Sequence, residues 1–222
     1  MQIGRAADSD GFRLVVPVRR PSSGKTRLAA ELGSPPLAGE LAEAAARDTL
    51  EAVSRCPRVH SVLLVTDDAA WSAGLPCDVH VQARAGLNAA VRAGLTCLGE
   101  TRRTAVMLGD LPALRPDDLG EALDRARSAP RGFVSDRYGT GTVLLTASAG
   151  ARHRPRFGTG SALLHRTSGY TELTVPAAST LRHDVDTLAD LRRAAELGLG
   201  PHTARVVEQG GLQVGRAEGM VA

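Results

Sequence analysis

Residues 12–28 read FRLVVPVRRPSSGKTRL, and this stretch decides the fold class. Its first part, 12–18, is an almost continuous apolar run, as found in strands that are buried on both faces of a sheet. The chain then passes through a Ser-Gly loop to Lys25 and Arg27 and into a segment that is predicted to be helical. A buried strand, a polar loop and a helix in this order form the repeating unit of parallel α/β sheets.

The same alternation continues along the chain. Further strands are predicted at 59–66, 78–82, 104–109, 132–135, 142–146 and 172–175, and helices at 37–54, 85–98, 116–128, 160–168 and 187–197. We therefore predict one three-layer α/β/α domain over residues 12–210, with a mostly parallel sheet, a disordered tail at 1–11 and a second tail at 211–222. Ligands of such sheets bind beyond the carboxyl ends of the strands, so the residues that follow the strands are the functional candidates.

The composition excludes several classes of protein. The 222 residues are 43% hydrophobic, which rules out disorder as the main state, and 27 basic residues nearly balance 24 acidic ones. Because the charges are interspersed and only 3% of residues are aromatic, we expect no nucleic-acid partner. No apolar run is long enough for a membrane span, and we expect the N-terminal residues not to be a signal peptide. Cys56, Cys77 and Cys97 form no C-x-x-C pair, so a reducing, cytoplasmic location is predicted.

Lys25 is the only lysine in the chain. Codon drift in a GC-rich genome explains why Arg replaces lysine elsewhere, and a lysine that survives indicates a site where a guanidinium cannot replace an ammonium. The alternative is the chance survival of a surface lysine. The functional interpretation of Lys25 is favoured, because Lys25, Arg19, Arg20 and Arg27 together place four cations within nine residues. A strict phosphate-binding P-loop is excluded, since Arg19 stands where that motif has glycine. We expect Lys25 on a solvent-facing loop that binds nucleotide phosphates.

Three aspartates stand where the fold would place a ligand. Asp110 ends an apolar strand, and Asp184 and Asp186 alternate in RHDVDTLADL. Carboxylates in such positions bind Mg²⁺ together with substrate phosphates. The alternative for Asp110 is a turn role. Asp186 or Thr187 could equally cap the next helix, with Asp190 completing a capping box, so we expect one aspartate to cap and the other to bind metal.

Two glycine-rich turns carry hydroxyl groups, DRYGTGT at 136–142 and FGTGSALLH at 157–165. Their backbone N–H groups and hydroxyls suit a small anion such as a phosphate or carboxylate. Asn88, within AGLNAA, reads by default as a helix cap and alternatively as a contact to a nucleotide base. His165 is notable only for its place after the second turn, and none of the six histidines has zinc-site spacing.

In their order and spacing, these segments resemble the phosphoenolpyruvate and 2-phospho-L-lactate guanylyltransferases of coenzyme F-420 biosynthesis, within the molybdopterin-guanylyltransferase-like nucleotidyltransferases. The resemblance covers nearly the whole chain after residue 12. The segments that carry it are VPVRRPSSGKTRL, LAEAAARDTLEAV, LLVTDD, GLNAAV, GDLPAL, DRYGTGT, FGTGSALLH and LRHDVDTLADL. Two positions depart from the family pattern: Gly109 precedes Asp110 where an Ala is expected, and Thr159 stands where a Pro is expected.

The resemblance implies a glycosyltransferase-A-type Rossmann-like fold and a defined reaction. A phosphate oxygen of phosphoenolpyruvate or 2-phospho-L-lactate attacks the α-phosphorus of GTP, and pyrophosphate leaves. The GC-rich composition favours phosphoenolpyruvate. The implied residues are Lys25, Arg27 and Asp110 for catalysis; Thr142, Gly158 and Ser161 for phosphoenolpyruvate; Pro17, Val18, Lys25 and Asn88 for the nucleotide; and Asp110, Asp184 and Asp186 for Mg²⁺.

The implied partners are these two small-molecule substrates, a second copy of the chain in a homodimer, and a downstream transferase that receives the unstable product. Three other functions stay open at this point. They are a related cofactor nucleotidyltransferase of the molybdopterin guanylyl- or cytidylyltransferase kind, a kinase or ATPase that transfers the γ-phosphoryl group, and a non-catalytic GTP-binding module. Both kinds of nucleotidyl transfer, to phosphoenolpyruvate or to another cofactor precursor, would release pyrophosphate, whereas a kinase or ATPase would release a nucleoside diphosphate.

Overall fold

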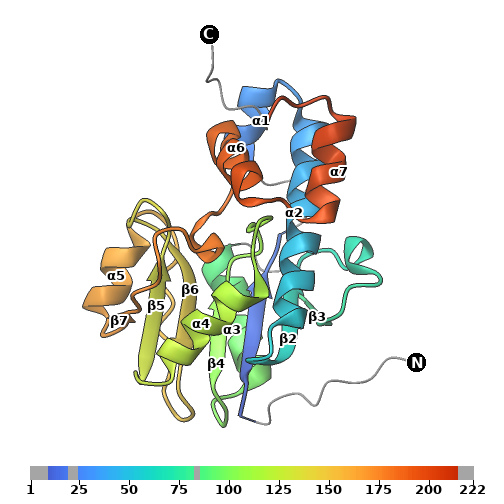
Figure 1. Cartoon of the computed structure of the whole chain (residues 1–222). Helices are drawn as coiled ribbons and strands as arrows, with labels where there is room; N and C mark the ends of the chain where they lie inside the picture. Colours follow the sequence, from blue (N-terminus) through green and yellow to red (C-terminus); the bar gives the residue numbers. More distant parts are fainter. Residues whose placement is uncertain (1–9, 20–24, 83–85, 215–222) are drawn as a thin grey trace.

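A mixed sheet with the strand order β3-β2-β1-β4-β6-β5-β7 forms the centre of the molecule (Figure 1). The computed structural model describes residues 10–19, 25–82 and 86–214. Only β6 among the described strands runs antiparallel to its neighbours. The strands are β1 (Phe12–Pro17), β2 (Val59–Thr66), β3 (Asp78–Val81), β4 (Thr104–Met107), β5 (Arg131–Ser135), β6 (Thr142–Ala147) and β7 (Thr171–Glu172).

Helices cover both faces of this sheet. The helices are α1 (Thr26–Leu32), α2 (Pro35–Arg55), α3 (Leu87–Leu98), α4 (Pro116–Ala126), α5 (Ser161–Thr167), α6 (Leu188–Leu197) and α7 (Pro201–Gln209), with single 3₁₀ turns η2 (Ala70–Ser72) and η3 (Thr180–Arg182). Helices α2 and α4 pack on one face, and α3 and α5 pack on the other. The predicted three-layer α/β/α arrangement with a mostly parallel sheet is therefore confirmed.

The alternation of side chains along the strands explains this layering. Successive residues of a strand point to opposite faces. In β1, Leu14 and Val16 belong to the core cluster under α2 and α4, whereas Val15 belongs to the cluster under α3. Because both faces are buried, the strand is apolar at every one of these positions. Gly94 of α3 lets that helix lie close to the sheet, since a Cβ there would lie 2.5 Å from Val15 Cγ1.

A third hydrophobic cluster lies beyond the carboxyl ends of the strands, where α1, α6 and α7 gather around one end of α2 (Figure 1). Sequence analysis missed α7. Its first turn is capped from a distant element, because the buried Asp48 carboxylate of α2 accepts the backbone N–H groups of His202 and Thr203 at 3.0 and 2.8 Å. Leu212 and Val214, within the predicted C-terminal tail, pack into the same cluster.

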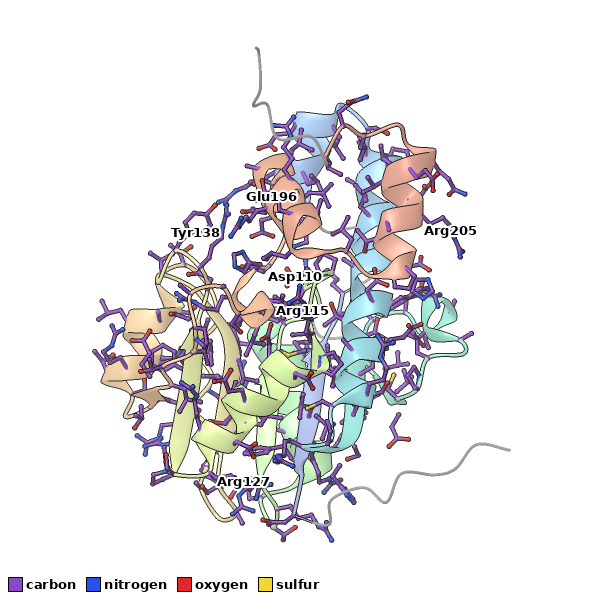
Figure 2. The ribbon with its side chains drawn as sticks, viewed as in Figure 1. Asp110, Arg115, Arg127, Tyr138, Glu196 and Arg205 are labelled. Carbon is purple, nitrogen blue, oxygen red and sulfur yellow. The ribbon has the colours of Figure 1, made fainter. Side chains whose placement is uncertain are left out.

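The strand order reverses beside β1, which places a ligand crevice at a defined point. β1 pairs with β2 on one side and with β4 on the other. In open α/β sheets, ligands bind beyond the carboxyl ends of the strands at such a reversal. Asp110 lies there, between the sheet and the helices above it (Figure 2). Within the described residues, no helix is long and apolar enough to cross a membrane.

Candidate active site

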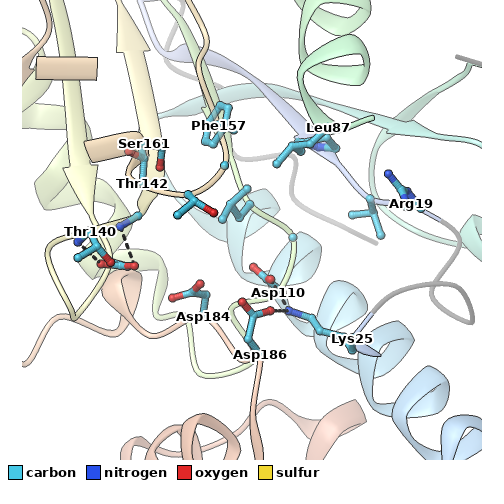
Figure 3. A pocket seen from close by; sticks show the side chains of 18 of the residues that line it. Arg19, Lys25, Leu87, Asp110, Thr140, Thr142, Phe157, Ser161, Asp184 and Asp186 are labelled. Atoms are coloured by element: carbon cyan, nitrogen blue, oxygen red, sulfur yellow. Dashed lines mark hydrogen bonds and ion pairs between the residues drawn. The ribbon is translucent and has the colours of Figure 1, made fainter. Parts of the chain in front are cut away.

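A cavity of about 830 Å³ lies at the reversal beside β1 (Figure 3). Its walls come from the ends of β1 and β4, the turns at 136–142 and 157–161, and the segment at 184–186. All predicted site residues except Asn88 are among those that line it: Pro17, Val18, Lys25, Arg27, Asp110, Thr142, Gly158, Ser161, Asp184 and Asp186. Asp110, Asp184 and Asp186 lie on one side of the cavity, and Thr142 and Ser161 lie on the other.

Lys25 joins two of the three carboxylates. Its ammonium nitrogen lies 2.5 Å from Asp110 Oδ2 and 2.6 Å from Asp186 Oδ1. Burial lowers the pKa of Lys25, but the two carboxylates raise it by more, so that the net shift is upward and the side chain stays charged. The expectation of a solvent-facing lysine was wrong, because the side chain is only 13% exposed.

The backbone of Lys25 has an unfavourable conformation. Its φ angle of 60° is left-handed, and within the described chain no other residue besides glycines has a positive φ. A bulky residue adopts this conformation only where its surroundings require it. Lys25 is the N-cap residue of α1, and its side chain makes no capping hydrogen bond. The predicted Ser-Ser-Gly loop before it, and Arg20, lie outside the described residues.

The buried carboxyl of Asp184 resists ionisation. Burial, followed by the charges of Asp110 and Asp186, raises the pKa of its carboxyl to about 8, and Lys25 lowers it by less. Oδ1 of Asp110 is buried and has no hydrogen-bond partner within the described residues. These carboxylates together carry more negative charge than one lysine neutralises, so the cavity suits an additional cation. Among the residues that the structure describes, however, no three acidic, His or Cys side chains form a complete metal site.

The N-cap residue of α6 is neither Asp184 nor Asp186. Thr187 is the N-cap residue, and Asp190 completes a capping box with it, as the sequence pattern allowed. The expectation that one aspartate of the pair Asp184 and Asp186 caps the helix was wrong. Asp190 also accepts a hydrogen bond from Tyr138 Oη at 3.0 Å, which ties the 136–142 turn to α6 (Figure 2).

The 136–142 turn is organised around its own carboxylate. Asp136 accepts the backbone N–H groups of Thr140 and Gly141 at 3.0 and 2.9 Å. Those two N–H groups are therefore not available for a substrate anion, contrary to the sequence interpretation. Gly141 is required by this close approach, because a Cβ there would lie 2.5 Å from Asp136 Oδ2. The turn lines the cavity with Asp136, Thr140, Gly141 and the buried Thr142.

The 157–161 turn is held in place by Asn88. The Asn88 side chain donates to the carbonyl of Phe157 at 2.8 Å and accepts the N–H of the same residue at 2.9 Å. The default interpretation as a helix cap was wrong, since Gly86 is the N-cap residue of α3. Both polar ends of the Asn88 amide contact this backbone, so in this structure the residue positions the turn that carries Gly158.

His165, which sequence analysis did not place in the site, lies directly behind Thr142. Its Nδ1 is 2.9 Å from Thr142 Oγ1, and its Nε2 accepts the backbone N–H of Arg156 at 2.9 Å. No sequence signal links positions 142 and 165, because the contact depends on the packing of α5 against the sheet. Asp136 could have been found, since an Asp shortly before a glycine is typical of turns.

A second, smaller cavity of about 240 Å³ adjoins the first. It shares Pro17, Val18, Arg19 and Leu87 with the main cavity, and it extends towards the end of β2. Its walls combine apolar side chains with a few polar groups, which is the usual character of a small-molecule site.

Comparison with known proteins places this geometry in a family. The chain is 47% identical to a phosphoenolpyruvate guanylyltransferase of Salinispora arenicola, over 87% of this chain and 92% of the relative. It is 44% identical to the Mycolicibacterium gilvum protein of the same name, over 91% and 97%, and 42% identical to that of Streptomyces coelicolor, over 88% and 95%. No family model matches the chain.

Solved structures show the same fold at low identity. A nucleotide-diphospho-sugar transferase of Desulfovibrio desulfuricans G20 matches with a TM-score of 0.70 and 16% identity, over 91% of this chain and 96% of that one. A nucleotidyl transferase of Methanothermobacter matches with a TM-score of 0.56 and 18% identity, over 85% and 98%. A Mycobacterium tuberculosis protein solved as a manganese complex matches with a TM-score of 0.55 and 21% identity, over 84% and 99%. From its fold, its cavity and its relatives, the chain belongs to the phosphoenolpyruvate guanylyltransferase family of nucleotidyltransferases.

Proposed function

We propose that this chain joins GTP and phosphoenolpyruvate. A phosphate oxygen of phosphoenolpyruvate attacks the α-phosphorus of GTP, the bond from that phosphorus to the β-phosphate breaks, and pyrophosphate leaves. The observation that carries the proposal is the set of relatives with this name at 40–47% identity over most of the chain. 2-Phospho-L-lactate, which offers the same attacking group, is the alternative acceptor.

The chemistry of the cavity supports this reaction. The attacking phosphate is already an anion, so that no side chain has to remove a proton. Among the lining residues that the structure describes there is neither His nor Cys. The task of the protein is to bring two anions together and to stabilise the charge that develops between them. Lys25 and Arg27 are the cationic groups that we assign to the phosphates of GTP.

We assign the nucleotide and the acceptor to opposite sides of the cavity. Pro17 and Val18 border both cavities, which suits a nucleotide whose base occupies the smaller one and whose phosphates reach the larger one. Thr142 and Ser161 lie on the side away from Lys25, and we assign them, together with Gly158 of the cavity wall, to phosphoenolpyruvate.

A divalent cation, Mg²⁺ in our proposal, belongs between these two sides. Asp110, Asp184 and Asp186 are the candidate ligands, and the buried, unpartnered Oδ1 of Asp110 supports this assignment. When bound, the cation would neutralise phosphate charge during the transfer. Mg²⁺ usually takes only one or two carboxylates and completes its coordination with phosphate and water oxygens.

The decisive experiment is product analysis with the purified protein. Incubation with GTP, phosphoenolpyruvate and Mg²⁺ should release pyrophosphate and give an enolpyruvoyl-diphosphoguanosine by mass spectrometry. Asp110→Asn, which keeps the shape of the side chain, should lose most of the turnover. Release of GDP instead would indicate a kinase, and GTP binding without turnover would indicate a non-catalytic module. A parallel reaction with 2-phospho-L-lactate decides between the acceptors.

Ser161 tests which side holds the acceptor. Ser161→Ala should raise the KM for phosphoenolpyruvate roughly ten- to hundredfold, because a hydrogen bond to a charged group contributes about 1.5–3 kcal/mol. The KM for GTP should change little. Ser168→Ala at the other end of the same helix is the matched control, since that hydroxyl bonds to the Leu164 carbonyl. Equal effects of Ser161→Ala on both substrates would contradict the assignment.

Four further points remain predictions from sequence. They are the homodimer, the hand-over of product to a downstream transferase, the place in coenzyme F-420 biosynthesis and the cytoplasmic location.

A further inference from the structure

The environment of His165 fixes where its single proton lies. The side chain is fully buried, among the rings of Phe133, Phe157 and Tyr170. Its Nε2 faces the backbone N–H of Arg156 at 2.9 Å. A backbone N–H can only donate, so Nε2 must offer a lone pair. In a neutral imidazole the proton is then on Nδ1.

His165 is neutral at ordinary pH. Burial, with a smaller contribution from the charge of Arg156, lowers the pKa of its imidazole to about 4. A second proton would also place two donors, Nε2–H and the Arg156 N–H, against each other. The neutral Nδ1–H tautomer is therefore the form that the packing selects.

This tautomer decides what Thr142 can offer. The Nδ1–H group donates to Thr142 Oγ1 across 2.9 Å. A hydroxyl has one proton and two lone pairs, and one lone pair is now used. The hydroxyl proton of Thr142 remains to be donated, and this residue lines the main cavity. With the opposite tautomer, Thr142 would donate to His165 and present only lone pairs to the cavity, which would repel an anion.

We propose that His165 is a positioning residue that holds Thr142 as a hydrogen-bond donor to the anionic acceptor substrate. The proposal rests on the assignment of Thr142 to the acceptor side of the cavity. His165 itself does not line the cavity in the described structure, so it acts on the substrate only through Thr142. An apolar side chain at this position would leave the Arg156 N–H and Thr142 Oγ1 without these partners.

His153 provides a matched comparison. It belongs to the same aromatic cluster, and burial lowers the pKa of its imidazole to about 4 as well. Its two nitrogens face hydroxyl groups, those of Tyr170 at 3.2 Å and Thr104 at 3.0 Å. Hydroxyls can donate or accept, so these contacts select no tautomer. Neither of these hydroxyl residues lines the main cavity in the described chain.

The first test measures the tautomer in the unaltered protein. Nitrogen NMR of protein labelled in its histidines distinguishes a protonated ring nitrogen from a bare one, and the His165→Asn spectrum assigns the signals. We expect Nδ1 of His165 protonated and Nε2 bare at pH 7. Protonation at Nε2 would overturn the proposal, and this measurement does not depend on the stability of any variant.

The second test uses two substitutions that each keep one half of the ring. The amide of Asn reaches the position of Nδ1, so His165→Asn keeps a donor towards Thr142. The amide of Gln reaches the position of Nε2, so His165→Gln keeps the Arg156 contact and loses that donor. We expect the KM for phosphoenolpyruvate to rise about tenfold or more in His165→Gln and less than about threefold in His165→Asn. The KM for GTP should stay within about twofold in both, and His153→Gln should leave both constants unchanged.

Thr142→Val separates failure of this proposal from failure of the function assigned to the cavity. Thr142→Val should raise the KM for phosphoenolpyruvate at least as much as His165→Gln, and the double variant should add nothing further, because both changes remove the same donor. If Thr142→Val has no effect on that KM, the acceptor assignment is wrong. If it has the effect and His165→Gln does not, or if the two effects multiply, the role of His165 is overturned.

Discussion

Lys25 shows how far one residue can depend on its surroundings. Its ammonium bridges carboxylates that are 76 positions apart in sequence, Asp110 and Asp186. An ammonium is a compact point charge, whereas a guanidinium is a wide planar fork. With contacts of 2.5 and 2.6 Å on two sides and a left-handed backbone, the site has little room for a larger head group.

We therefore predict that Lys25→Arg loses turnover by about 100-fold or more although it keeps the charge, and that Lys25→Ala loses at least as much. Both variants keep the same strained backbone, so the difference between them reports on the side chain. Since the lysine is buried between two carboxylates, Lys25→Ala should also lower the melting temperature when no divalent cation is present. The measurements are kcat/KM for GTP and thermal melts. A near-normal rate in Lys25→Arg would mean that this lysine survived by chance.

At the scale of elements, the ends of β1 and β4 meet without space for another atom. Gly109 follows β4, and a Cβ there would lie 2.4 Å from Val18 Cγ2 and 3.3 Å from Val16 Cγ1. The Ala expected from the family resemblance would therefore collide with Val18 in this chain. A β-branched side chain moves only with its backbone, because its χ1 angle is restricted.

We predict that Gly109→Ala destabilises the protein by about 1–3 kcal/mol, as overpacking typically does. It should also raise the KM for GTP, since Val18 borders both cavities. The matched test is the double variant Gly109→Ala with Val18→Ala, in which the space for the new methyl group is restored. Urea unfolding and GTP kinetics should both recover towards the unaltered protein. A Gly109→Ala protein with unchanged stability and KM would contradict this account.

The elements that could be predicted from sequence are those whose signal is local. β2 has the predicted bounds, 59–66, because its apolar run stands between turn residues. The capping box of α6 was likewise visible in Thr187 and Asp190. By contrast, α7 depends on Asp48, 154 residues before His202, and no pattern of neighbouring residues reports such a contact. The antiparallel direction of β6 could not be predicted either, because it depends on which strands lie next to β6 in the sheet.

The candidate site divides in the same way. Sequence placed Asp110, Asp184 and Asp186 at one cavity, since each stands at the edge where ligands bind in this fold. The sequence could not show which hydrogen-bond partners the individual side chains of the site have. The roles of Asn88 and His165 both depend on how α3 and α5 pack on the sheet, and they became visible only through the bonds to Phe157 and Thr142.

At the scale of the whole molecule, the helical cluster above the sheet brings the acidic residues to the cavity. Val185, between the two aspartates, is buried in this cluster together with Leu28 of α1. The backbone N–H of Val185 also donates to the carbonyl of Asp110 at 3.1 Å. Folding thus gathers carboxylates of like charge around one point, which is unfavourable unless a cation joins them. The site has been built at a cost in stability, as is usual where function needs strained or repelling groups.

Asp184 makes this cost measurable as a function of pH. Burial and the charges of Asp110, Asp186 and Asp136 raise its pKa from 3.8 to about 8, against the smaller opposing effect of Lys25. A raised pKa means that the folded state holds the proton more tightly than the unfolded state. The contribution of this group to stability is therefore complete below about pH 4, falls as the pH rises, and is lost above about pH 8.

Asp184→Asn removes this titration and keeps the shape of the side chain. In a chelator, we predict that the variant melts above the unaltered protein at pH 8–9, by about 2 °C or more, and that the difference shrinks towards pH 4. Saturating Mg²⁺ should raise the melting temperature of the unaltered protein more than that of the variant, because bound cation stabilises the folded state by mass action. Turnover should nevertheless fall in Asp184→Asn. A melting difference that is independent of both pH and Mg²⁺ would show that the Asp184 carboxylate neither carries the strain of the acidic cluster nor helps to hold a cation.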